Sequence, residues 1–105
     1  MKIDFNQELK NIEGATLTRT RQDGDKIVQL PATLKWAAVE ALLAVGATDK
    51  LSGEEKGRRY DLALKVQESH GPIELPVEDV SLIKTLCDEH FAPLIVGQTR
   101  KMLNG

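Results

Sequence analysis

Hydrophobic and polar residues alternate along the first third of the chain in a pattern typical of β-strands. Ile3, Phe5 and Leu9 share a parity, which predicts a first extended segment. The β-prone runs at 15–21 and 26–30 flank an Asp-Gly pair, which favours a hairpin because glycine tolerates the positive φ of a tight turn. This part of the chain therefore predicts a strand followed by a β-hairpin.

The rest of the chain has the three- and four-residue spacing of amphipathic helices. Thr33 and Ser52 are candidate N-caps, and Pro93 either separates two helices or kinks one long helix. Gly97 in the last helix costs about 1 kcal/mol relative to alanine, which predicts a close packing contact there. The predicted helices are one that begins after Thr33 and breaks at 45–50, one from Ser52 to near residue 68, one at 76–91 and one at 93–103.

The order of these elements indicates the fold class. Strands come first and helices follow, with one short extended piece at 73–75 between helices. This order is typical of the α+β class, in which helices cover one face of a small antiparallel sheet. We expect residues 1–105 to form a single domain, in which the hairpin and the later strand make the sheet and about four helices pack against it.

Composition adds limits on function. Hydrophobic residues make up 41% of the chain and charged residues 29%, as in an ordinary globular domain. The net charge is −2, with seven basic and seven acidic residues in 1–52 and seven basic against nine acidic in 53–105. Neither half has the basic excess that nucleic-acid-binding domains show, so nucleic acid is not the expected partner.

Cysteine content and hydropathy bear on location. The single cysteine excludes an intramolecular disulfide and suits a reducing compartment. The first residues lack the apolar core of a signal peptide, and no apolar run approaches the roughly 20 residues that cross a bilayer. We therefore expect a cytoplasmic protein without membrane contact.

The stretch LSGEEKGRRYDLALKV at 51–66 sets a Ser-Gly turn beside several basic residues, as a phosphate site would. It lacks the long glycine-rich loop and the Gly-Lys-Ser/Thr ending of a Walker-type loop. Ser52 and Glu55 have the spacing of a capping box, which satisfies backbone donors at a helix start. The pattern therefore indicates a solvated helix face, with three acid-first pairs spaced four residues apart: Glu54–Arg58, Glu55–Arg59 and Asp61–Lys65.

Arg59 differs from its basic neighbours, because it falls inside the apolar arc that also holds Tyr60, Leu62 and Val66. Two interpretations are open. The stem of Arg59 covers apolar surface of its own domain, or this side of the helix meets a protein partner, since arginine and tyrosine are enriched at interface hot spots.

The last helix is a second candidate interaction surface. It is apolar on more than one side, and Ile95 and Met102 are among its apolar residues. Such a helix either is buried on both sides or offers one side to a partner, including a second copy of the chain.

Basic residues on the hairpin support a different class of function. Arg19, Arg21 and Lys26 would suit a basic β-ribbon that enters a nucleic-acid groove, so a small nucleic-acid-binding regulator is the alternative hypothesis. Asp23 and Asp25 at the turn oppose it. Exposed strands also carry lysine and arginine simply to discourage edge pairing.

Cys87 and His90 are the remaining chemical candidates, three residues apart on one predicted helix. They would supply half of a zinc site at most, and the chain has no second cysteine. A thiol nucleophile with its base is conceivable, but Cys87 lies on the apolar stripe, where cysteine acts as a small hydrophobe. We therefore expect no metal, no cofactor and no catalytic residue, and hence a non-enzymatic protein.

The segments LSGEEKGRRYDLALKV, VEDVSLIKTL and APLIVGQTRKML, with the opening MKIDFNQELKNIEG, resemble small uncharacterised proteins encoded by tailed bacteriophages and prophages. The similarity spans most of the chain, and this sequence differs from the pattern of those proteins at the long hairpin of 16–30. The resemblance identifies no catalytic or binding residue. It implies an accessory protein, in the host cytoplasm or on the virion, that acts by binding a phage or host protein. Virion or tail assembly and binding of a host factor are the expected settings.

Overall fold

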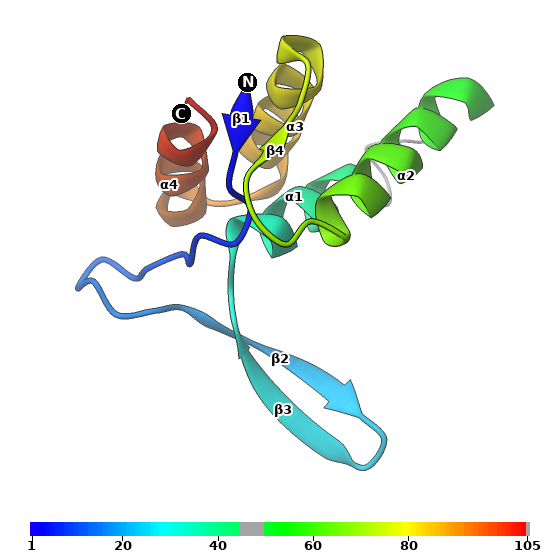
Figure 1. The fold of residues 1–105 in the computed structure, drawn as a ribbon. Coiled ribbons are helices and arrows are strands. Elements are labelled where there is room, and N and C mark those ends of the chain that lie inside the picture. Colours follow the sequence, from blue (N-terminus) through cyan, green and yellow to red (C-terminus); the bar gives the residue numbers. More distant parts are fainter. Residues whose placement is uncertain (45–49, 105) are drawn as a thin grey trace.

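The computed structural model describes residues 1–44 and 50–104. Four helices and two small antiparallel sheets are present in this part of the chain, which confirms the α+β class. In chain order (Figure 1) the elements are β1 (Lys2–Ile3), β2 (Thr18–Asp23), β3 (Lys26–Pro31), α1 (Leu34–Leu42), α2 (Gly53–Gln67), β4 (Ile73–Glu74), α3 (Val77–His90) and α4 (Pro93–Leu103).

The helices begin where local sequence signals predict, and α2, α3 and α4 also end there. α1 ends at Leu42, and the break predicted at 45–50 lies mostly outside the described residues. The side chains of Thr33 and Ser52 cap α1 and α2, each accepting the backbone N–H three residues later. Phe91, between α3 and α4, is extended at φ −110° and ψ 161°, so Pro93 begins a separate helix and does not kink a longer one. No helix among the described residues is both long and apolar enough to cross a membrane.

The two sheets are separate, and each has two strands in the described residues. β1 pairs with β4, with Lys2 opposite Glu74 and Ile3 opposite Ile73, whereas β2 pairs with β3. The late strand therefore joins β1 and not the hairpin, unlike the single sheet that the element order suggests. Ile3 is buried, Ile73 packs against the same core, and Leu75, directly after β4, is also buried, so apolar side chains hold the β1–β4 ribbon against the helices.

The core lies among the helices and the β1–β4 ribbon. α1 is central, because it packs against α2, α3 and α4. The core is mainly aliphatic, as the composition predicts, with Phe5 as its one fully buried aromatic residue in the described part. The largest fully buried side chains are those of Ile3, Phe5, Leu9, Leu34, Leu42, Val66, Leu75, Ile83, Cys87, Thr99 and Leu103.

The β2–β3 hairpin projects from the helical body as an arm (Figure 1). None of residues 18–31 is buried, and Gly24 takes the positive φ of +64° that the tight turn needs. The two legs of the arm meet at its base, where the Ala32 N–H donates to the Leu17 carbonyl at 2.8 Å. The Leu9 N–H donates to the Ala32 carbonyl at 2.8 Å and the Leu9 carbonyl accepts from the Leu17 N–H at 2.9 Å, which joins this base to the body. The radius of gyration is 13.9 Å, slightly above the roughly 13 Å expected for a compact chain of this length.

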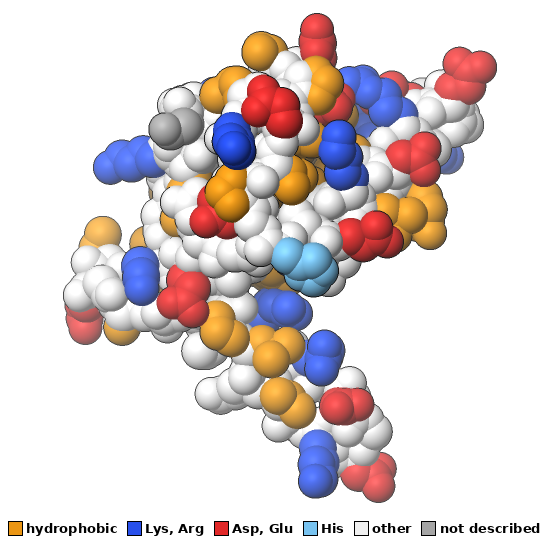
Figure 2. Space-filling model, in the orientation of Figure 1, with side chains coloured by type: hydrophobic (Ala, Val, Ile, Leu, Met, Phe, Trp, Pro, Cys, Tyr) orange, Lys and Arg blue, Asp and Glu red, His pale blue; other side chains and the backbone are white. Residues whose placement is uncertain are grey.

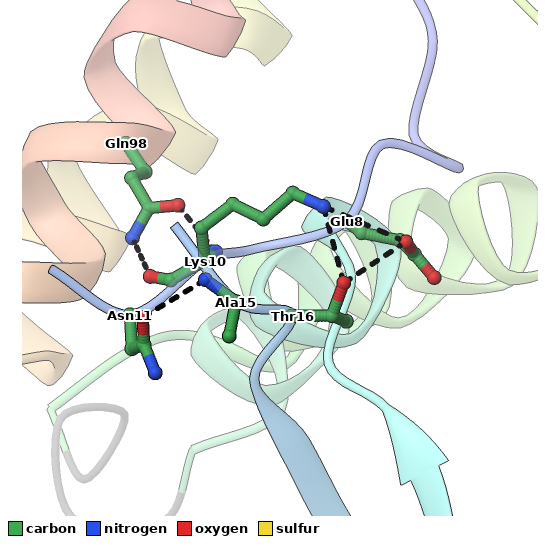
Figure 3. Close-up of polar contacts among 6 residues, drawn as sticks. All are labelled: Glu8, Lys10, Asn11, Ala15, Thr16 and Gln98. Carbon is green, nitrogen blue, oxygen red and sulfur yellow. Dashed lines mark hydrogen bonds and ion pairs between the residues drawn. The ribbon is translucent and has the colours of Figure 1, made fainter. Parts of the chain in front are cut away.

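A side-chain clamp fixes the loop that leads into the hairpin (Figure 3). The Gln98 amide of α4 accepts from the Lys10 N–H and donates to the Lys10 carbonyl, both at 2.6 Å. Within the loop, the Asn11 side chain accepts from the Ala15 N–H at 3.0 Å, and the Lys10 ammonium donates to Thr16 at 3.1 Å. The amide of Gln98 thus pairs with both backbone groups of one residue, as a neighbouring antiparallel strand would.

Candidate interaction surfaces

Three charged residues of α2, Glu55, Arg58 and Arg59, are paired within the helix, and Arg58 also pairs with α3. Arg58 donates to Asp79 at 3.0 Å and lies 3.5 Å from Glu55; the hydrogen bond to Asp79 raises the pKa of the Arg58 guanidinium. Of the three acid-first pairs that the spacing predicts, Glu55–Arg59 is the one formed among the described residues, at 3.6 Å. These contacts are those of a solvated helix face.

Arg59 points into its own domain. The residue is 9% exposed, and its side chain lies beside Leu42 and Leu43 at the end of α1. Its Nε and Nη1 atoms are buried and have no hydrogen-bond partner in the part of the chain that the structure describes, with Glu55 as the nearby counter-ion. Arg59 therefore has little surface to offer a partner and mainly packs α2 against α1.

The other predicted residues of α2 divide between the core and the surface. Leu62 and Val66 are buried and cannot contact a partner of the folded protein. Tyr60 is 55% exposed, and Leu64, one turn further along α2, is 40% exposed. The side of α2 that can meet another molecule is therefore the one that carries Tyr60 and Leu64.

Tyr60 and Leu64 belong to an apolar groove between α1 and α2, with a volume of about 170 Å³. Leu43, at the end of α1, is also exposed, at 48%. Hydrophobic side chains lie over α2 in Figure 2, on the right of the view. The lining residues of this apolar groove are Val39, Leu43, Tyr60, Ala63, Leu64 and Gln67.

The predicted residues of α4 are turned mostly inward. Ile95 and Met102 are partly buried, and they pack against the small cluster of Leu9, Ala32 and Ala37 that anchors the hairpin base. Ile95 and Met102 are seven residues apart and share one side of α4, which the domain itself uses, so the opposite side, with Leu94 and Gly97, is the one left for a partner.

Gly97 lies on the exposed side of α4. A Cβ atom added at this position would meet nothing within 4 Å. The prediction of a close packing contact at Gly97 is therefore wrong, because no element in residues 1–44 or 50–104 approaches the helix there.

A second hollow lies where the hairpin meets α1. Arg19 and Arg21 are two residues apart on β2 and therefore share a face, and they meet Lys35 of α1 in a cleft of about 260 Å³. Figure 2 shows lysine and arginine side chains gathered between the arm and the helical body. This basic cleft is lined by Arg19, Arg21, Thr33, Lys35, Trp36, Val39, Glu40 and Gln67.

The cations of the basic cleft are held in different ways. Lys35 is fixed, because its ammonium donates to the Ser69 carbonyl at 2.6 Å. The Nε atom of Arg19 is buried without a hydrogen-bond partner among the described residues. Lys26 is not part of the cleft, since it lies opposite Asp23 at the far end of the hairpin.

Cys87 and His90 do not form a joint site. Cys87 is buried with its thiol 3.9 Å from the Ala37 carbonyl, and burial raises the pKa of this thiol to about 12. His90 is exposed and packs edge-on against Phe91, with ring centroids 4.7 Å apart. Among residues 1–44 and 50–104, no group of three or more metal-ligating side chains comes together.

Comparison with known proteins does not add to this geometry. No family model, no curated protein and no solved structure matches the chain.

The two candidate surfaces, the apolar groove and the basic cleft, also include residues that the sequence pattern did not single out, notably Lys35, Leu43 and Leu64. Leu64 lies in the same apolar arc as Tyr60, so helical spacing could have found it, whereas the approach of Lys35 to the hairpin carries no local signal.

Proposed function

We propose that this chain is a non-enzymatic accessory protein, encoded by a phage or prophage, that binds a protein partner through the apolar groove between α1 and α2. The observation that carries the proposal is the exposure of Leu43, Tyr60 and Leu64 around one apolar hollow. Apolar side chains are a stronger sign of a binding site when they gather around a groove than when they are scattered singly over the surface.

The composition of the groove also favours a protein ligand. A partially exposed tyrosine beside aliphatic residues is typical of interface hot spots, because it offers a large contact area at low entropic cost. Two helices that leave an apolar groove between them can accept the apolar face of a third helix. The phage setting, with roles in virion or tail assembly or on a host factor, is supported by the sequence resemblance alone.

The test uses two matched leucine variants. Leu64 in the groove is 40% exposed and Leu94 on α4 is 39% exposed, so Leu64→Glu and Leu94→Glu make the same chemical change at equal exposure. The partner is first captured from bacterial lysate and identified. Calorimetry with the purified partner then gives its affinity for the wild type and for each variant. We expect Leu64→Glu to weaken binding by about tenfold or more and Leu94→Glu to leave it unchanged.

The reverse pattern, or equal effects of the two substitutions, would contradict the groove as the binding site. Light scattering at several concentrations covers the case in which the partner is a second copy of the chain. In that case the wild type forms dimers as its concentration rises, and Leu64→Glu restores the monomer.

A nucleic-acid-binding regulator is the second candidate, and the basic cleft is the observation that favours it. Arg19 and Arg21 share this cleft with Lys35. Glu40 also lines it. Binding of DNA or RNA that weakens steeply as salt rises, and that is lost in the Arg19→Gln/Arg21→Gln variant, would support this candidate.

A further inference from the structure

The basic cleft and the apolar groove are adjacent parts of one surface. Val39 of α1 and Gln67 of α2 line both of them. The groove between α1 and α2 and the cleft at the root of the hairpin therefore lie side by side, with Val39 and Gln67 between them, and one extended ligand can contact both. One end of this surface is apolar and the other carries three cations.

The cationic end has no ion-paired partner among the described residues. Arg19, Arg21 and Lys35 make no ion pair with any described residue, and Glu40 is the one acidic residue in the described lining. The buried Nε of Arg19 is without an acceptor in the same part of the chain. A buried donor without an acceptor is unfavourable, and an incoming acceptor that it can reach relieves this cost.

From this juxtaposition we infer that the partner presents an acidic amphipathic segment, with a large apolar side chain in the groove and carboxylates in the basic cleft. The inference rests on the proposed function, because it takes the groove as the site of a protein partner. Planar guanidinium groups match carboxylates in a two-pronged geometry, so Arg19 and Arg21 are suited to recognise aspartate or glutamate. Lys35, held by Ser69, adds a fixed charge beside them.

The same surface is poorly suited to a nucleic-acid strand. A strand carries a charge at every nucleotide and needs a continuous basic track, whereas here the cations end at an apolar groove. The tip of the arm carries Asp23 and Asp25, which repel phosphates. A protein segment supplies both an anionic and an apolar part, and it is therefore the better match to both hollows.

The first experiment selects ligands without assuming a sequence. A displayed library of random peptides is selected on the intact chain, and the selected peptides are synthesised, together with versions in which every aspartate and glutamate is replaced by asparagine and glutamine. We expect selected peptides to combine acidic residues with leucine, phenylalanine or tryptophan. Their amide versions should bind about tenfold more weakly, because charge-assisted hydrogen bonds are lost.

The second experiment uses a matched pair of charge variants on the same hairpin. Arg21→Gln and Lys26→Gln each remove one exposed positive charge, but only Arg21 lines the basic cleft. Arg21→Gln should weaken the acidic peptides about tenfold and leave their amide versions unchanged, while Lys26→Gln should change neither. Unchanged melting curves for both variants would show that the fold is retained.

Other outcomes separate this inference from the proposed function. If the selected peptides are apolar and lack acidic residues, the inference of an acidic partner is wrong, but the groove remains the proposed binding site. Equal effects of Arg21→Gln and Lys26→Gln would have the same meaning. An absence of selected peptides, or peptides that Leu64→Glu binds as well as the wild type, would overturn both. Single-stranded oligothymidylate could instead displace the peptides from the wild type and fail to bind the Arg21→Gln variant. This result would assign the cleft to nucleic acid and overturn the inference.

Discussion

At the scale of single residues, burial decides which side chains can take part in chemistry. Cys87 is the chain's one thiol, and α3 turns it into the core toward Ala37. Burial raises its pKa from the usual 9.0 to about 12, so the thiol is protonated as well as shielded at neutral pH. Helical spacing places Cys87 and His90 on related faces, yet one is buried and the other exposed.

Cys87 should therefore not react with a thiol reagent in the native protein and should react fully in denaturant. Above about pH 9 the unfolded chain releases this proton while the folded chain keeps it until about pH 12. The free energy of unfolding should then fall by up to about 1.4 kcal/mol per pH unit over this range. Below pH 9 both states hold the proton and the thiol contributes no pH dependence.

The control for this prediction is Cys87→Ala, which removes the titrating group. The difference between wild type and Cys87→Ala in chemical denaturation at increasing pH isolates the contribution of the thiol. Rapid labelling of the native wild type, or the same pH dependence in Cys87→Ala, would contradict the prediction.

At the scale of elements, local sequence signals predicted most of what the structure shows. Caps at Thr33 and Ser52, the proline that begins α4 and the Asp-Gly turn act within a few residues, and the elements they define begin or turn where the pattern places them. Gly97 is the exception. Its cost to helix stability suggested a packing reason, but no neighbour approaches it, so the glycine is a local weakness of α4.

Gly57→Ala in α2 and Gly97→Ala in α4 should each raise the free energy of unfolding by about 0.5–1 kcal/mol, because both sites are helical and open. Denaturation in urea measures the change. A loss of stability in Gly97→Ala would mean that the helix is more crowded than the structure shows.

Gly24→Ala should have the opposite effect and destabilise the hairpin, since the φ of +64° at the turn strains a residue with a Cβ. It should lower the hydrogen-exchange protection of the hairpin amides.

At the scale of the whole molecule, the arrangement of elements was less predictable than the elements themselves. The pairing of β4 with β1 and the projection of the hairpin depend on contacts between residues far apart in the sequence, which local patterns do not encode. The same holds for the candidate surfaces. Tyr60, Arg19 and Arg21 were singled out from their positions, but the meeting of the two arginines with Lys35 needed the three-dimensional fold.

The arm should be separable from the body. None of residues 20–29 is buried, and Arg19 lies directly opposite Leu30, so an Asn-Gly turn that joins these two residues should close a shortened hairpin. The shortened chain should keep its circular dichroism spectrum and nearly its melting temperature, because the base contacts of Leu17 and Ala32 remain. Loss of helical signal would show that the arm supports the body.

The position of Trp36 has a practical consequence. It is the chain's only tryptophan, it lines the basic cleft, and its ring centroid lies 5.5 Å from that of Phe91. Its intrinsic fluorescence therefore samples the cleft without a contribution from any second indole. A carboxylate brought beside this ring would shift its emission, so a ligand could be titrated in real time with the unlabelled wild-type protein.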